Sequence, residues 1–312
     1  MSDANETPTP PAPPPASKGA VFVRRLASTL VLWGILAAAI LTGNRWLFLG
    51  LIVVFGGASL VEWCRMFAGA ITPGARRWLY LVAALYAAAI VGIGERSGGG
   101  GLLPIVASWS LVDTAGLTLL LFGLFCLVMR RELEGRKTLW LIFAATVGFL
   151  YIPVLFSFVW RVLWIPTGAA PGQPLPGVFY LLFIVMVTKF SDMGAYFFGI
   201  LIGRKKMIPH ISPGKTWEGL GGAFFGAYVG GCSLYALASA HLQVLSWPVV
   251  IAIIPVLTIV AVMADLAESV IKRCVEVKDS GHSLPGIGGA LDLIDSLLFT
   301  VPLGWLIILQ IM

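Results

Sequence analysis

The side chains best suited to chemistry lie close together near the C-terminal end of the sequence. The chain is 58% hydrophobic and only 12% charged, yet ionisable residues gather between positions 265 and 295. They include Asp265, Glu268, Lys272, Arg273, Lys278, Asp279, Asp292 and Asp295. A glycine-rich turn at residues 285–289 interrupts them. Charged groups are costly near a bilayer and usually serve a function there, so we expect a functional site in this stretch.

Helical periodicity arranges the first of these residues on two faces. If the helix of the preceding apolar run continues, Asp265, Glu268 and Lys272 share one face. Ser269 and Arg273, four residues apart, share another. Carboxylates that converge with hydroxyls and cations are what magnesium bound to substrate phosphates requires. This ion takes hard oxygen ligands, few of them from protein and the rest from phosphate and water.

Asp292 and Asp295 begin the last apolar run and lie three residues apart, hence side by side on a helix. Two interpretations remain open for Asp292, which could cap this helix or bind a metal. Asp295 lies a full turn further into the run, where a cap no longer needs it. We therefore expect Asp295 to be a metal ligand.

A second polar segment surrounds Asp192, at the edge of an earlier apolar run. An unpaired carboxylate there would cost several kcal/mol, on the order of the penalty for burying a charge, so Asp192 needs a cation. That cation is either Lys189 or a metal. The glycines at 199 and 203 form a GxxxG pattern, which favours close helix packing and offers a possible homodimer face.

The basic segment that follows contains Gly214, Lys215 and Thr216, which suggests a P-loop. The pattern fails because a P-loop needs a glycine where Pro209 stands. We expect instead a rigid turn that presents Lys215 to phosphate just before a helix begins. For residues 204–206 topology alone explains the charge, and His210 is expected to be a solvated loop residue.

Hydropathy makes most of this chain a membrane domain. Its mean hydropathy of +0.93 far exceeds that of soluble domains. The chain is predicted to be an all-α polytopic integral membrane protein with about nine transmembrane helices. The expected spans are 26–43, 46–63, 78–94, 102–129, 138–160, 178–198, 219–240, 247–264 and 291–311. The fourth is overlong and holds Asp113, so we expect a break or a re-entrant piece there.

The domain organisation is expected to be simple. Residues 1–20 are polar and proline-rich and are predicted to form a disordered tail. Residues 21–312 form a single membrane domain, with N-terminal spans over 21–176 and catalytic helices and loops over 177–312. The four cysteines have no paired spacing and indicate neither zinc nor a disulfide framework.

Basic residues follow every even-numbered span, which by the positive-inside rule places the N-terminus and the charged loops in the cytoplasm. The net charge of +6 then reflects topology and attraction to anionic lipid, not nucleic-acid binding. No organellar targeting segment is apparent. The expected location is the inner (cytoplasmic) membrane of a bacterial cell, with multiple passes and an active site that faces the cytoplasm.

Two ordered motifs resemble those of the phosphatidate cytidylyltransferase (CDP-diacylglycerol synthase) family. The matching positions are Ser191, Asp192, Gly194, Ala195, Tyr196, Ile211, Ser212, Pro213, Lys215, Thr216, Trp217, Glu218, Gly219, Ser269, Lys272, Arg273, Lys278, Asp279, Gly281, Pro285, Gly286, Gly288, Gly289, Asp292, Asp295 and Ser296. The chain departs from the family pattern at Ile287, Leu293 and Ala264, where the family usually has histidine, arginine and glycine. The acids and lysines of the pattern are all present.

The resemblance implies that CTP and phosphatidic acid give CDP-diacylglycerol and pyrophosphate, with Mg²⁺ or another divalent cation. It implies catalytic roles for Asp265, Lys272, Asp279, Asp292 and Asp295. The metal would be held by Asp192, Asp265, Asp292 and Asp295. The substrates would be held by Lys215, Ser269, Arg273, Lys278, Gly286, Gly288 and Gly289.

Three other functions remain open on the sequence. A secondary transporter or channel would use acids near the midplane of the membrane, but here the acids cluster at one side. A CTP-using lipid kinase would share the need for metal and phosphate contacts and would differ in its product. A non-catalytic scaffold would explain the hydrophobicity but not the acids.

Overall fold

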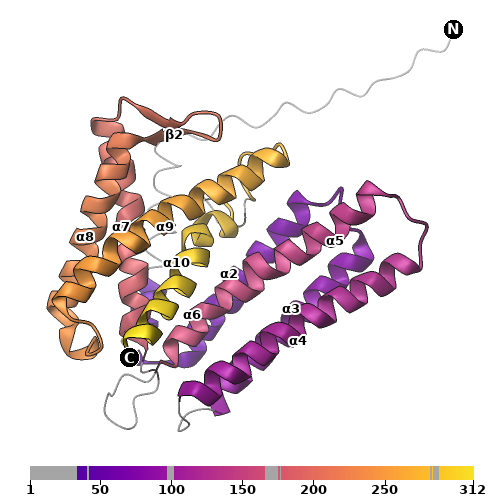
Figure 1. The fold of residues 1–312 in the computed structure, drawn as a ribbon, viewed down its shortest axis with the longest axis horizontal. Coiled ribbons are helices and arrows are strands. Elements are labelled where there is room, and N and C mark those ends of the chain that lie inside the picture. The colour runs from indigo at the N-terminus through magenta and orange to yellow at the C-terminus, as the bar shows by residue number, and fades with distance from the viewer. Residues whose placement is uncertain are drawn as a thin grey trace.

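The computed structural model describes residues 34–40, 42–96, 102–165, 175, 177–281, 283 and 288–312. Over these residues the chain is a bundle of long helices (Figure 1). The helices are α2 (Arg45–Met66), α3 (Pro73–Arg96), α4 (Leu102–Met129), α5 (Arg136–Phe149), α6 (Leu155–Leu163), α7 (Val178–Leu201), α8 (Trp217–Ala238), α9 (Trp247–Cys274) and α10 (Ala290–Ile311). A π-helical turn, η1 (Leu150–Val154), joins α5 to α6, and a 3-10 turn, η2 (Ser239–His241), follows α8.

Eight helical segments in the described part of the chain are long and apolar enough to cross a membrane. They coincide with eight of the expected spans, so the polytopic all-α prediction is confirmed for them. Half of the expected span 26–43 lies outside the described residues, and the tail 1–20 and Gly286 lie outside them entirely. The expected break in the fourth span is wrong, because α4 is one continuous helix.

The path of the chain through α5, η1 and α6 follows from Pro153. Proline has no N–H and its ring collides with the preceding turn, so a helix must widen locally to continue past it. The π-turn at Leu150–Val154 provides that widening, and the segment from Arg136 to Leu163 still forms one span. The widened turn also brings Ser157 toward Tyr86 of α3, with 3.1 Å between the two hydroxyl oxygens.

Asp113 keeps α4 continuous because it has a cation inside the bundle. Its carboxylate accepts two hydrogen bonds from the guanidinium of Arg161 on α6, at 3.0 and 2.5 Å. Tyr86 donates to the same carboxylate at 2.7 Å and accepts from Arg161 at 2.9 Å. Arg161 is only 2% exposed. A charge that is paired and hydrogen-bonded in this way needs no break in the helix.

The centre of the bundle is α10, which packs against α2, α6, α7 and α9. Figure 1 shows α9 and α10 between the α7–α8 pair on one side and the α3–α4 pair on the other. The helices α7 and α8 lie in backbone contact, since a Cβ on Gly194 would meet the carbonyl of Gly222 and one on Gly226 would meet that of Phe190. Gly199 also faces α8, at Gly219, so the predicted packing role of this glycine is confirmed within one chain. The homodimer remains a prediction.

A two-stranded hairpin departs from the all-α prediction. Strands β1 (Lys206–Ile208) and β2 (Ser212–Thr216) pair antiparallel directly before α8. The carboxylate of Glu218, in the first turn of α8, accepts hydrogen bonds from the backbone N–H groups of Arg204 and Lys205 at 3.1 to 3.2 Å. These bonds draw the chain back over the helix start and leave β2 beside β1, so residues 212–214 form a strand instead of the expected turn.

We predict that Arg161→Met destabilises the protein by roughly 3–5 kcal/mol, the usual cost of leaving one buried charge without its partner. Thermal unfolding in detergent would measure the loss. The double variant Asp113→Leu/Arg161→Met, which removes both charges, should recover most of it. A double variant no more stable than Arg161→Met would show that the pair is not what holds α4 to α6.

Candidate active site

A polar cavity of about 600 Å³ lies beneath the hairpin at one end of the bundle. Its walls come from α7, β2, α8, α9 and α10, so segments distant in the sequence meet there (Figure 1). The charged residues that line it include Lys189, Asp192, Lys206, Lys215, Asp265, Asp292 and Asp295. Five of the residues singled out from the sequence thus share one cavity: Asp192, Lys215, Asp265, Asp292 and Asp295.

Three carboxylates converge beside this cavity, and two of them, Asp265 and Asp295, line it. Asp265, Glu268 and Asp295 each place an oxygen within 4.8 Å of the other two. Glu268 is 1% exposed and Asp295 is 7% exposed. The Oε1 atom of Glu268 is buried and has no hydrogen-bond partner among the described residues.

The three carboxylates fit a divalent cation. Like charges held this close repel one another, and a buried acceptor without a partner is costly, so the cluster is stable only with positive charge beside it. Hard carboxylate oxygens are the ligands that Mg²⁺ and similar ions prefer. Two of the predicted metal ligands, Asp265 and Asp295, belong to this group. The sequence argument placed Glu268 on the same helix face as Asp265 but did not include it among the metal ligands.

Asp292 lies beside this trio and is held by different partners. Its carboxylate receives a hydrogen bond from Lys272 at 2.9 Å and one from the backbone N–H of Gly289 at 2.9 Å. The second bond caps the start of α10, so the capping interpretation of Asp292 describes the geometry. Lys272 also pairs with Glu268 at 2.6 Å. Lys272 therefore bridges the acids of α9 and α10.

Lys215 joins the hairpin to α9. Its ammonium lies 2.9 Å from the carboxylate of Asp265 and donates to the carbonyl oxygen of Val262 at 3.0 Å. The side chain is 20% exposed, so it reaches into the cavity from β2 and remains accessible from it. An incoming phosphate would meet Lys215 at the edge of the acid cluster.

Lys189 closes the opposite side of the cavity. Its ammonium donates to the carbonyl of Leu293 at 2.9 Å and to the hydroxyl of Ser296 at 3.0 Å. It also lies 3.5 Å from the carboxylate of Asp192. The prediction that Asp192 needs a cation is therefore met by Lys189. Ser296 donates to Asp192 at 3.3 Å and completes the link between α7 and α10.

The charges around the cavity do not cancel. Five carboxylates (Asp192, Asp265, Glu268, Asp292 and Asp295) lie near three ammonium groups that pair with them (Lys189, Lys215 and Lys272), and Lys206 also lines the cavity. When all of these are ionised one negative charge remains, which favours binding of a cation. Because the cluster is largely withdrawn from water, this attraction is weakly screened.

Other predicted site residues lie away from the cavity in the described part of the chain. Arg273 is exposed and donates to the carbonyls of Ile211 and Val277 at 3.4 and 3.2 Å. Lys278 and Asp279 are exposed on the loop after α9, and Ser269 lies on α9 half-buried. Their predicted roles remain predictions.

The loop before α10 includes the glycines predicted to approach the nucleotide. Gly288 has φ +125°, a backbone conformation that side chains rarely adopt. A Cβ on Gly289 would collide with the hydroxyl of Ser280, which lies against this turn. Both glycines thus serve the close packing of the loop in the structure. Gly286 and Ile287 lie outside the described residues.

Glu62 of α2 positions this loop, and sequence reasoning missed it. Its carboxylate is fully buried and receives three hydrogen bonds. Two come from the backbone N–H groups of Ala290 and Leu291, each at 2.9 Å, and one comes from the hydroxyl of Ser280 at 3.1 Å. Glu62 therefore accepts hydrogen bonds from N–H groups at the start of α10 that have no partner within the helix. Asp292 and Asp295 project from the same part of α10. The available signal was a lone glutamate inside the expected span 46–63.

Comparison with known proteins identifies the family. The chain matches the cytidylyltransferase family over residues 23–311, so it belongs to that family. It is 39% identical over 135 residues to the phosphatidate cytidylyltransferase of Staphylococcus saprophyticus, an alignment that covers 43% of this chain and 51% of the relative. The corresponding Staphylococcus aureus (strain COL) enzyme is 36% identical over 134 residues, 43% of this chain and 50% of the relative. The chain thus spans about half the length of these two relatives.

A longer alignment joins this chain to a protein of Escherichia coli (strain K12) named uncharacterized protein YnbB. The two are 29% identical over 304 residues, which covers 92% of this chain and 87% of the relative. The resemblance drawn from the motifs is confirmed at the level of the family, and so is the expectation of a nucleotidyltransferase.

We predict that Glu62→Ala lowers the free energy of unfolding by roughly 3 kcal/mol or more, since each of three orphaned donors costs about 1–3 kcal/mol. Thermal unfolding in detergent measures this. The control is Glu132→Gln, which alters an exposed glutamate on the loop after α4. Equal melting temperatures for the two variants would contradict the positioning role of Glu62.

We predict that divalent cations raise the melting temperature of the unmodified protein. Saturation at a hundred times Kd corresponds to about 2.7 kcal/mol of stabilisation. Glu268→Gln should abolish most of this shift because it removes the negative charge of one of the three clustered carboxylates. Glu132→Gln should retain the full shift. A Glu268→Gln protein that responds to Mg²⁺ or Mn²⁺ like the unmodified one would exclude Glu268 from the metal site.

Proposed function

We propose that this member of the cytidylyltransferase family transfers CMP from CTP to phosphatidic acid, giving CDP-diacylglycerol and pyrophosphate. The observation that carries the proposal is the convergence of Asp265, Glu268 and Asp295 beside a polar cavity that three lysines line. Both substrates are polyanions, so the main tasks of such a site are to neutralise charge and to hold the reacting groups in line. The names of two relatives agree with this reaction.

The reaction balances with the groups at hand. A phosphate oxygen of phosphatidic acid forms a bond to the α-phosphorus of CTP, and the bond from that phosphorus to the pyrophosphate oxygen breaks in line. The nucleophile is already an anion, so no strong base is required. Lys215 and Lys272 would face the charge that develops on the phosphates. Arg273, in the last turn of α9, and Lys278, on the loop that follows, would attract CTP.

Mg²⁺ is the proposed cofactor, held by Asp265, Glu268 and Asp295. When bound it would supply positive charge to the triphosphate and polarise its oxygens. Asp192 and Asp292 lie at the edge of this group and would act through water or by orienting Lys189 and Lys272. Asp279 remains a proposed further ligand or a partner of Lys278, and Ser269 and Gly286 remain proposed substrate contacts.

The proposed setting is the inner (cytoplasmic) membrane of a bacterium, with the site on the cytoplasmic side. In support, the loop after α4, the hairpin and the end of α9 lie at the same end of the bundle (Figure 1). These segments carry clustered basic residues, as cytoplasmic loops do. A lipid headgroup and a soluble nucleotide could meet only at such a surface.

The structure weighs against a transport function. A transporter would place acids or broken helices at the midplane. Asp113, an acid well inside a span, is closed off by Arg161 and Tyr86 and does not line the polar cavity as the described residues define it. A lipid kinase remains distinct by its product, because a kinase adds a phosphate and this reaction adds CMP.

The decisive experiment is turnover of CTP and phosphatidic acid by the detergent-purified protein, with and without Mg²⁺. Mass spectrometry would detect CDP-diacylglycerol and pyrophosphate together. Formation of both, only with a divalent cation, is the expected result. A phosphorylated lipid with CDP would indicate a kinase, and the absence of any product from folded protein would overturn the proposal.

We predict that Asp295→Asn reduces this turnover by about 100-fold or more, because even partners outside the first shell of a metal typically contribute 10–100-fold. The protein should remain folded, since asparagine keeps the shape and the hydrogen bond to the backbone of Ser296. Glu132→Gln is the matched control and should turn over normally. Near-normal turnover by Asp295→Asn would remove Asp295 from the site.

A further inference from the structure

An apolar chamber lies directly beside the polar cavity. It encloses about 250 Å³ between α2, α6, α7 and α10. Its walls are aliphatic and aromatic, as in Phe48, Phe156, Val185, Ile294 and Leu297. Several of these side chains are only partly buried, so the chamber is not sealed.

Lys189 belongs to both spaces. It lines the polar cavity together with Asp192 and Asp295, and it is the charged residue among the described side chains that line the apolar chamber. Two of its three ammonium hydrogens are directed to the carbonyl of Leu293 and the hydroxyl of Ser296, at 2.9 and 3.0 Å. The third faces Asp192 at the longer distance of 3.5 Å. This cation therefore stands at the boundary, and its longest contact, the one to Asp192, is the one that an anionic oxygen of a ligand would most easily replace.

We propose that the chamber binds one acyl chain of the phosphatidic acid substrate, with the lipid phosphate at Lys189. The inference rests on the proposed function. Its support is that Lys189 lines both spaces, since a lipid phosphate needs a cation where its hydrocarbon begins. The chain would enter between α2, α6, α7 and α10, and the phosphate would then lie beside the acid cluster, where the attack on CTP takes place.

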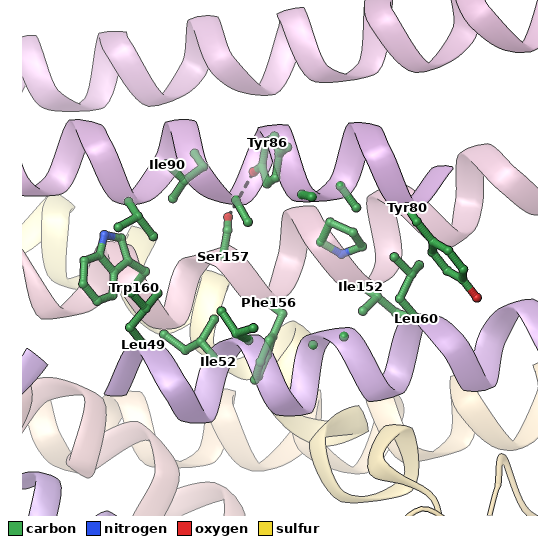
Figure 2. Close-up of a pocket in the computed structure, with 18 of the residues that line it drawn as sticks. Leu49, Ile52, Leu60, Tyr80, Tyr86, Ile90, Ile152, Phe156, Ser157 and Trp160 are labelled. Atoms are coloured by element: carbon green, nitrogen blue, oxygen red, sulfur yellow. Dashed lines mark hydrogen bonds between the residues drawn. The ribbon is translucent and has the colours of Figure 1, made fainter. Parts of the chain in front are cut away.

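A second apolar chamber serves as a comparison for the first, because its lining differs. This chamber, of about 340 Å³, lies on the other side of α2 against α3 and α6 (Figure 2). Ile52 and Phe156 line both chambers and so form the wall between them. Polar atoms of the second chamber come from residues such as Tyr86 and Ser157, whose hydroxyls lie 3.1 Å apart and donate to Asp113 and to the carbonyl of Val154, respectively. None of its described lining residues also lines the polar cavity.

The chamber is expected to select and position the lipid more than to attract it. An acyl chain leaves the bilayer for an environment of similar polarity, so there is little hydrophobic gain. Binding of the acyl chain instead fixes the position of the lipid phosphate. This reduces the translational and rotational entropy that must still be lost before the reaction. The expected signature is therefore a dependence of turnover on chain length.

The test fills the chamber and compares two substrates. Val185→Phe adds bulk on α7 inside the chamber, and Val91→Phe makes the same change in the second chamber, where Val91 is likewise half-buried. Each protein is assayed with dioleoyl and with dioctanoyl phosphatidic acid. We expect Val185→Phe to lower the ratio of long-chain to short-chain turnover about tenfold. Val91→Phe should have the same ratio as the unmodified protein.

Three outcomes would overturn the inference. They are an unchanged ratio in Val185→Phe, an equal change in both variants, and an effect confined to Val91→Phe. Failure of the unmodified protein on both lipids would refute the proposed function itself, which distinguishes the two failures.

A second measurement avoids substitutions altogether. Phosphatidic acid with a photoreactive acyl chain, cross-linked to the unmodified protein, should label the segments 181–185 and 293–297, which line this chamber and not the second one. Labelling confined to residues 80–91 would place the chain in the second chamber and contradict the proposal. This result does not depend on whether Val185→Phe folds.

Discussion

The hydrogen bonds of Glu62 are the interaction on which the site depends. The position of the acids of α10 depends on Glu62 of α2, because the first N–H groups of α10 donate hydrogen bonds to its carboxylate. A helix start buried in a bundle cannot leave these donors unpaired, and a negative charge also complements the helix dipole. This contact explains why a site built from α7, α8, α9 and α10 requires the N-terminal helices. They supply the anchor, although the polar cavity itself is lined by later segments.

The site is built to be electrostatically incomplete. Lys189, Lys215 and Lys272 each pair with a carboxylate, which keeps the acids in place, but they do not neutralise all of them. Preorganised charge of this kind costs stability and would lower the reorganisation needed if a cation and phosphates bound there. The same bundle shows the opposite arrangement at Asp113, whose carboxylate accepts hydrogen bonds from Arg161 and Tyr86. The acid of one ionic group is paired with a cation, and the other group keeps an excess of carboxylates.

The sequence predicted those features that depend on local spacing. Hydropathy located eight spans because each must satisfy its backbone hydrogen bonds within one helix. Spacings of three and four residues correctly aligned Asp265 with Glu268. The role of Glu62 was not predictable in this way, since its partner Leu291 lies 229 positions away. The hairpin was missed for a similar reason: the bonds from Arg204 and Lys205 to Glu218 outweigh the turn tendency of residues 212–214.

The position of α2 connects these observations. Its end carries Glu62, which binds the start of α10, while its middle carries Ile52, which lines an apolar chamber on each side. A shift of α2 would therefore alter the start of α10 and the shape of the chamber beside Lys189 together. In a membrane, where apolar packing alone discriminates little between helix and lipid, such a helix needs a polar anchor to hold its place. Glu62 provides that anchor, and the same bonds that orient Asp292 and Asp295 thereby set the width of the space next to them.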